Sequence, residues 1–489
     1  MITRPFLWIA PLCCLAILCV SYLELSWLFC IFLGILSSLL FTFVFKVKLV
    51  AILALILLLL VTVRTHGALT QQKRFSQADG QTVRAEITVI SSTERHSIVY
   101  ARCSAKEVGL QGAPLQLYLN DHDLSVGERV LADVTLSSDT EQNELAILSS
   151  DIVGSATVKK VRERKDSVGF LTVAHRLRTK LNRLLIGCIP PDESATLSAL
   201  VLGDRSRLNS TLSTAARRSG ITHIFVVSGL HLSIVVGSLI RFLKKFFGHP
   251  LFILLATLVT VLLLCAVCGF SHSSLRAGLT FLLCSAAPLF CRENDSINTL
   301  GVAVVILLLL NPFSLFSLSF QLSVLSTLGI LVLNPTFSKA FEKHPSTVLR
   351  AIMDSTTLTL SAMFFTAPVL VACFGELSII APVTNLFISF AVTAALLLTV
   401  LGGLLSILPV ANILSPVFFS AAGMMAKYLN EAAYFFSKFP LATVKLPKYV
   451  SGILWLFVLA ILLCLDYRTA KKKKARYEKA VYGEEKCKE

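Results

Sequence analysis

The chain is organised around residues Leu197–Ile240, which read LSALVLGDRSRLNSTLSTAARRSGITHIFVVSGLHLSIVVGSLI. The second half is apolar enough to lie in a membrane, yet it contains His223, His231 and a Ser228-Gly229 pair between them. A break in a membrane helix leaves backbone amides without partners, so it is tolerated only where protein or a water-filled cavity covers them. We therefore expect this stretch to face the inside of the protein, beside whatever passes through it.

Composition places the chain among membrane proteins. Of its 489 residues, 55% are hydrophobic and only 15% are charged, and the mean hydropathy is +0.76. A soluble domain cannot bury that much apolar surface, so we expect a polytopic α-helical membrane protein. The formal net charge of +16 does not by itself indicate nucleic-acid binding, because basic residues beside membrane spans record topology and contact with anionic lipid.

Apolar runs near the length of a membrane span recur along the chain and predict about twelve spans. They are residues 6–22, 27–45, 49–63, 221–240, 251–269, 274–291, 297–310, 318–333, 358–374, 379–405, 413–436 and 450–465. The run 297–310 is short and the run 379–405 is long. Re-entrant segments in place of full spans therefore stay open, and the count could differ by two.

Basic residues beside these runs set the expected orientation. Lys46 and Lys48 mark a cytoplasmic turn, which puts the N-terminus in the cytoplasm and the segment after the third run outside. The Lys244-Lys245 pair and the basic run at 471–476 fall on the cytoplasmic side of the same count. We therefore expect a multi-pass protein of the cytoplasmic (inner) membrane, with both termini in the cytoplasm and no cleaved signal peptide.

Residues 65–166 differ completely in composition from the apolar runs. Apolar and polar residues alternate there over 83–89, 115–119 and 130–136. A period of two predicts a small antiparallel β domain, a sandwich or an OB-like barrel, which the topology makes extracytoplasmic. Residues 66–165 contain 12 Lys plus Arg and 13 Asp plus Glu, so no electrostatic footprint for nucleic acid is visible. Single strands could still stack on Tyr100 and Tyr118, and a structural spacer is an equally good interpretation.

Residues 167–220 are predicted to form amphipathic helices between the β domain and the membrane core. Within 162–183 there are seven Lys or Arg and two acidic residues, and apolar side chains recur at helical spacing. This pattern is typical of a helix in the membrane interface whose cations reach the lipid headgroups. A helix packed on the bundle with a solvated basic face is an equally good interpretation, and either could guide a polyanion. The basic residues assigned to the interface are Arg176, Arg178, Lys180 and Arg183.

Three polar residues in the later apolar runs have ordinary structural explanations. Arg276 lies near the end of its run, where the guanidinium can snorkel to the interface. Gln321 suits an interhelical hydrogen bond. Asn385 follows Pro382, at which we expect another helix break. Each is a weak signal alone, but together such residues can line a passage.

Enzymatic chemistry is not predicted. A Ser-His hydrolase fails as an interpretation of VVSGLH at 226–231, because the stretch lacks a G-x-S-x-G elbow and a third triad member. His223 and His231 project about 80° apart on a continuous helix, which argues against a shared metal ion. The 13 cysteines lie mostly in apolar runs without paired zinc spacing, so we expect buried apolar cysteines and neither a metal nor a cofactor.

Five motifs resemble, in order and spacing, those of the ComEC-type competence proteins. They are LVLGDRSRL at 200–208, SGITHIFVVSGLHLSIV at 219–235, SHSSLRAG at 271–278, NPFSLFSLSFQLSVLSTLGIL at 311–331 and GELSIIAPVTNLF at 375–387. With three leading spans and an OB-like domain, the resemblance covers nearly the whole chain. Many members also carry a C-terminal metallo-β-lactamase-like domain with an H-x-H-x-D-H metal motif. Residues 468–489 of this chain are expected to form a basic cytoplasmic tail instead.

The resemblance implies a membrane channel that carries single-stranded DNA into the cytoplasm during natural transformation. Residues 1–64 would be the three leading spans and 221–467 the channel core. Because neither the metal motif nor a G-x-x-x-x-G-K-[ST] loop is found, the implied partners, besides membrane lipids, are a DNA receptor, a cytoplasmic ATP-driven motor and a separate nuclease. The positions that match the family's pore region are Asp204, Arg205, His223, Ser228, Gly229, His231, Arg276, Gln321 and Asn385.

Two alternatives stay open on the residues alone. One is a permease for a smaller anionic or amphiphilic solute, which a polar interior would serve equally well. The other is a membrane-anchored assembly protein whose outer β domain does the binding. Assembly into a homo-oligomer is also open. On the channel hypothesis, the cations at Arg205, Arg207, Arg217 and Arg218 would compensate phosphate charge near its mouth.

Overall fold

The computed structural model describes residues 4–23, 48–92, 98–119, 124, 126–137, 152–165, 169–225, 229–247, 249–270, 272–290, 295–341, 346–408, 411–440 and 442–462. Three predictions lie outside these residues. They are the second apolar run, the basic tail and the position of Ser228.

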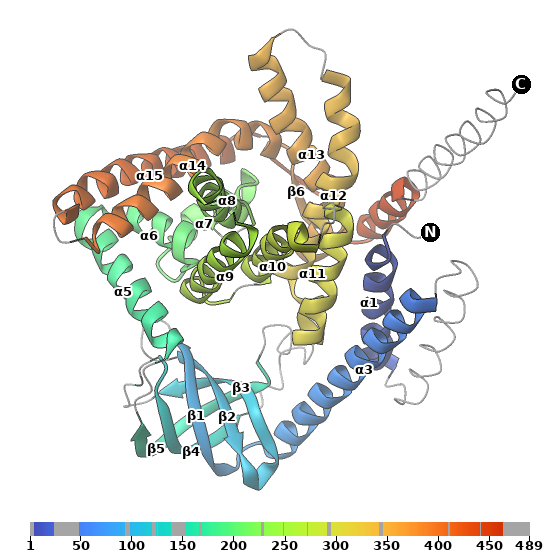
Figure 1. Ribbon diagram of the computed structural model, residues 1–489, viewed down its shortest axis with the longest axis vertical. Helices are drawn as coiled ribbons and strands as arrows, with labels where there is room; N and C mark the ends of the chain where they lie inside the picture. Colours follow the sequence, from blue (N-terminus) through green and yellow to red (C-terminus); the bar gives the residue numbers. More distant parts are fainter. Residues whose placement is uncertain are drawn as a thin grey trace, which may run out of the picture.

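The protein is mostly helical, with one β-barrel that lies beside the helical part and is joined to it by two helices (Figure 1). On one side α1 (Phe6–Leu23) packs against α3 (Lys48–Gln77), and α3 runs down to the barrel. On the other side α5 (Phe170–Cys188) leads from the barrel back to the helices. In chain order, the described residues thus form two helices, the β-barrel, α5 and then the remaining helices.

The barrel is closed and has the strand order β1-β2-β3-β5-β4. Its strands are β1 (Thr82–Ser92), β2 (Ile98–Ala105), β3 (Leu110–Leu119), β4 (Arg129–Ser137) and β5 (Gly154–Lys165). The alternating residues of β1, β3 and β4 point their apolar side chains into one buried core, as their period of two predicts. The expectation of a wholly antiparallel domain was wrong for one pair, because β3 and β5 run parallel with Leu115 opposite Gly154.

Helix α3 continues past the apolar run that predicted it and ends in the barrel. Phe75 is 1% exposed and belongs to the barrel core, as does Ala78, which follows the helix. The Phe75 ring lies on Gly154, where a Cβ atom would be 2.1 Å from the ring. The predicted boundary at residue 64 therefore falls inside a helix, since helix-forming polar residues extend α3 beyond the apolar stretch.

Replacing Phe75 with alanine should loosen the barrel in the full-length protein. Deleting a buried Phe side chain costs about 3–5 kcal/mol, which corresponds to roughly 10²- to 10⁴-fold faster amide exchange in strands that open together. Hydrogen exchange of β1–β5 measures this effect directly. The matched control is Phe170→Ala, because Phe170 begins the other connecting helix and is exposed. Equal protection of the strands in both variants would show that α3 does not anchor the barrel.

The helices after α5 are arranged around a central group with two longer pairs at its edge (Figure 1). In chain order they are α6 (Pro191–Leu197), the π-helix Ser198–Leu202, α7 (Ser210–Arg218), α8 (Gly229–Phe246), α9 (Pro250–Val267), α10 (His272–Ala286), α11 (Ser296–Leu310), α12 (Leu318–Phe341), α13 (Thr347–Phe374), α14 (Ala381–Leu405) and α15 (Ser415–Ser437). The two pairs are α12 with α13 and α14 with α15. A two-stranded sheet, β6 (Glu376–Ser378) and β7 (Thr443–Lys445), joins the start of α14 to the segment after α15.

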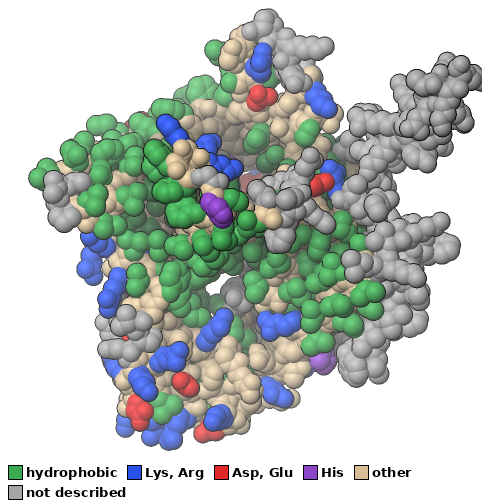
Figure 2. All heavy atoms as spheres, viewed as in Figure 1, with side chains coloured by type: hydrophobic (Ala, Val, Ile, Leu, Met, Phe, Trp, Pro, Cys, Tyr) green, Lys and Arg blue, Asp and Glu red, His purple; other side chains and the backbone are tan. Residues whose placement is uncertain are grey.

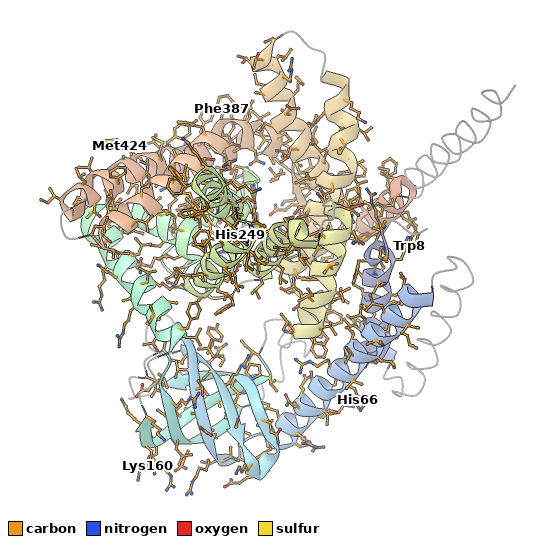
Figure 3. All side chains as sticks on the ribbon, viewed as in Figure 1. Trp8, His66, Lys160, His249, Phe387 and Met424 are labelled. Atoms are coloured by element: carbon orange, nitrogen blue, oxygen red, sulfur yellow. The ribbon has the colours of Figure 1, made fainter. Side chains whose placement is uncertain are left out.

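Five of the described helices are long and apolar enough to cross a membrane: α3, α9, α12, α13 and α14. Three shorter apolar helices, Phe6–Tyr22, Ser296–Leu310 and Val450–Leu462, coincide with other predicted runs. Large apolar side chains such as Phe387 and Met424 lie exposed on α14 and α15 (Figure 3). The helical, span-bearing character of the chain is confirmed, while the count of twelve stays a prediction.

Pro382 does not break a helix. It occupies the first turn of α14, where its fixed φ angle suits the start of a helix and its missing N–H is not needed. The run 379–405 therefore contains one helix, Ala381–Leu405, and the expected interruption before Asn385 was wrong.

Candidate functional site

The predicted span 221–240 is not one helix, which confirms an interruption in this stretch. Gly220 adopts φ +78°, a left-handed conformation that ends the turn after α7. A 3-10 turn follows at Thr222–Phe225, and α8 begins at Gly229. The two histidines therefore lie on different elements, His223 on the turn and His231 in the first turn of α8.

The two imidazoles differ in exposure. His231 is only 3% exposed, whereas His223 is on the exposed side of its turn. The two imidazoles therefore do not share one helix face.

Arg276 is buried beside the start of α8 and does not snorkel to an interface. Its side chain is 8% exposed, and Nε donates a 2.7 Å hydrogen bond to Oγ of Ser323 on α12. A Cβ atom placed on Gly229 would lie 2.6 Å from Nη2 of Arg276. The expectation of snorkelling was wrong. Ser323 accepts a hydrogen bond from the guanidinium, and Gly229 has no side chain that would occupy its place between α8, α10 and α12. We call Gly229, Arg276 and Ser323 the arginine cluster.

Arg205 holds the end of the 3-10 turn through a hydrogen bond to its backbone. Its Nε donates a 2.9 Å hydrogen bond to the carbonyl oxygen of Phe225, the last residue of the turn. Burial lowers the pKa of this guanidinium below its ordinary value, although arginine keeps its charge at neutral pH. Arg205 therefore positions the segment that carries His223.

Asp204 is engaged with the loop and with α5. Its Oδ1 accepts a 3.0 Å hydrogen bond from the backbone N–H of Ser206, and Oδ2 lies 3.9 Å from Nη2 of Arg178. Arg178 also donates to the carbonyl oxygen of Val267 at the end of α9. These two contacts turn the Arg178 side chain toward the bundle, while its grouping with Arg176, Lys180 and Arg183 at the membrane interface stays a prediction.

Gln321 and Asn385 lie outside the arginine cluster. Nε2 of Gln321 donates to the carbonyl oxygen of Leu315 at 2.8 Å. This bond closes the turn before α12, so the expected interhelical hydrogen bond was wrong. Asn385 lies half-buried near the start of α14, one turn after Ala381. A Cβ atom on Gly220 would be 2.4 Å from Cβ of Ala381, so this end of α14 packs directly on the turn that precedes His223.

Comparison with protein families decides what kind of chain this is. Residues 200–471 match the family model described as "Competence protein", which is more than half of the chain. The chain belongs to the competence protein family. The resemblance based on the five motifs is thereby confirmed.

Two relatives of this competence family protein are partial matches. It is 24% identical over 318 residues to ComE operon protein 3 of Bacillus subtilis, a match that covers 63% of this chain and 39% of that protein. It is 31% identical over 126 residues to the uncharacterized protein MG316 homolog of Mycoplasma pneumoniae, covering 26% of this chain and 32% of that one. The chain thus spans well under two thirds of either relative. No solved structure matches it.

The competence family motifs, far apart in the sequence, meet around the interrupted segment. The motif with Arg276 reaches α8 through Gly229, and the motif 311–331 contributes Ser323. The motif 375–387 reaches the turn before His223 through Ser378, whose Oγ donates a 2.9 Å hydrogen bond to the carbonyl oxygen of Arg218. Reasoning from sequence missed Ser323 and Ser378 because serines are common in apolar helices and turns and give no periodic signal.

The competence family core has the chemistry of an anion contact. The charged member of the arginine cluster is the guanidinium of Arg276. Within the described ranges, no group of three or more His, Cys, Asp or Glu side chains is placed to hold a metal ion. The arrangement supplies positive charge and hydrogen-bond donors at one point inside a set of apolar helices.

Proposed function

We propose that this protein carries single-stranded DNA across the cytoplasmic membrane during natural transformation, and that the strand passes the arginine cluster. Membership in the competence protein family supports the process. The role of the cluster rests on one observation, the burial of Arg276 against the first residue of α8. A buried cation among apolar helices is costly, and such groups in membrane segments mark the path of ions or substrates.

The start of α8 adds to the positive potential at this point. The first N–H groups of a helix have no partner within it, and the helix dipole makes that end positive. Helix N-termini therefore bind phosphate groups, and a guanidinium donates to the same oxygens in a paired geometry. Gly229 and Arg276 bring these two elements together. A DNA strand carries one negative charge per nucleotide, so one such site can hold successive phosphates as the strand moves.

The remaining features of the proposal concern the setting of this site. The five-stranded closed barrel suits an OB-like domain, and we place it outside the cytoplasmic membrane. The proposed arrangement has about twelve spans, with both termini in the cytoplasm. Its path is also lined by Asp204, His223, Ser228, Gln321 and Asn385. A DNA receptor, a cytoplasmic motor and a separate nuclease are the proposed partners, and the protein itself does no catalysis.

Uptake of labelled DNA by a strain without this gene tests the proposal. We expect label to reach the cell surface but not the nuclease-protected cytosol, and the wild-type gene to restore it. His231→Ala should fail to restore uptake although the protein accumulates, because it removes a buried imidazole from the first turn of α8, two residues after Gly229. Normal uptake in the deletion strain would contradict the proposal. Loss of growth on one small anionic solute, with normal DNA uptake, would favour a permease.

A further inference from the structure

An open surface hollow with basic side chains lies along α5, and none of its described lining residues belongs to the arginine cluster. Its volume is about 670 Å³, and its described lining residues are His175, Arg176, Thr179, Lys180, Arg183 and Leu184. The three cations are spaced four and three residues apart, which places them on one face of the helix. Figure 2 shows Lys and Arg side chains along this edge, between the barrel and the end of α14 and α15. Burial and then the charge of Arg178 lower the pKa of His175, so the positive charge comes from the three cations.

The cavity borders an exposed apolar surface at the end of α14. Nζ of Lys180 donates a 3.2 Å hydrogen bond to the carbonyl oxygen of Ser406, directly after α14. Around this residue Leu404, Ile407 and Leu408 are each more than half exposed. On α5 itself Val173 is also more than half exposed. The basic hollow therefore lies next to exposed apolar side chains, whose contact with water is unfavourable.

We propose that this cavity binds the headgroup of an anionic glycerophospholipid. The phosphate lies among Arg176, Lys180 and Arg183, and an acyl chain covers the apolar side chains at the end of α14. Guanidinium and ammonium groups are the usual partners of lipid phosphates, and basic hollows beside membrane helices hold anionic headgroups.

The surroundings favour a lipid over a nucleic-acid strand. Single strands bind grooves in which bases stack on aromatic rings, but none of the described lining residues is Phe, Tyr or Trp. A phospholipid matches both halves of the site, since it joins one phosphate to long apolar chains. The inference does not depend on DNA transport, because none of the described lining residues belongs to the arginine cluster.

Lipid binding to the purified full-length protein tests the proposal. Native mass spectrometry in detergent compares phosphatidylglycerol with phosphatidylcholine. We expect wild type to prefer phosphatidylglycerol, and Arg176→Gln/Lys180→Gln/Arg183→Gln to bind it at least about ten-fold more weakly. The matched control, Lys159→Gln/Lys160→Gln/Lys165→Gln, removes the same charge from exposed positions of β5 and should keep the preference; Lys160 points away from the barrel (Figure 3).

Single substitutions and a DNA-binding measurement test the proposal even if the triple variant folds poorly. Arg176→Gln should weaken phosphatidylglycerol binding several-fold and Arg176→Lys should largely retain it, because charge is the main requirement. Binding of a fluorescent oligothymidylate should be the same in wild type and in the cavity variants. The proposal is overturned if wild type shows no headgroup preference or the cavity variants retain it. Loss of oligothymidylate binding with unchanged lipid binding overturns it too.

Discussion

The Gly229→Val variant is expected to lose DNA uptake by about 10- to 100-fold while the protein still inserts and accumulates. A Cβ atom at this position would lie 2.6 Å from Nη2 of Arg276, so the branched side chain must displace the guanidinium. Displacement breaks the 2.7 Å hydrogen bond to Ser323 and covers the free end of α8 with methyl groups. The measurement is labelled DNA in the nuclease-protected fraction, normalised to the amount of protein in the membrane.

Gly237 provides the matched control for this variant. It lies on the same helix, α8, and a Cβ atom there would meet nothing within 4 Å. Gly237→Val therefore changes the same residue type in the same helix without touching the arginine cluster, and uptake should stay near the wild-type level. If both variants conduct DNA equally well, the contact between Gly229 and Arg276 plays no part in transport. If both fail to accumulate, α8 does not tolerate β-branched residues and Gly229→Ala replaces them in the test.

The separation of the 3-10 turn from α8 could be predicted from the sequence, whereas the partners of Arg276 could not. Ser228-Gly229 and two histidines within an apolar run are local signals, and local signals determine where a membrane helix can be continuous. Ser323 is 47 residues from Arg276 in the chain, and no periodicity connects them. The direction of the Arg276 side chain depends on which helices pack together, which is a property of the tertiary structure.

The β-barrel shows the same division. Strands β1, β3 and β4 follow from strict alternation, because one face of each is buried. Strand β5 was missed, since its second half is the basic run 159–165 and its outer residues carry no apolar period. Its parallel pairing with β3 follows from closing the barrel, which a strand-by-strand inspection does not reveal.

The Arg276→Gln variant is expected to lose DNA uptake by about 100-fold and, at the same time, to be at least as stable as wild type. Glutamine can still donate to Ser323, but it removes the positive charge that would attract phosphate. Removing a buried cation relieves its desolvation cost, so the amount of protein in the membrane and its thermal unfolding in detergent should not fall. If Arg276 lowers the stability of the protein but is needed for transport, its presence is best explained by its function.

Two further variants separate charge from packing at this position. Arg276→Lys keeps the charge but cannot form the paired hydrogen bonds of a guanidinium, so uptake should lie between wild type and Arg276→Gln. Arg64→Gln is the control, because Arg64 also sits on a membrane helix but donates to the carbonyl oxygens of Leu309 and Leu310 at the end of α11. It should weaken packing and leave uptake per molecule unchanged. Lower stability of Arg276→Gln together with normal uptake per molecule would assign Arg276 to packing and remove the cluster from the DNA path.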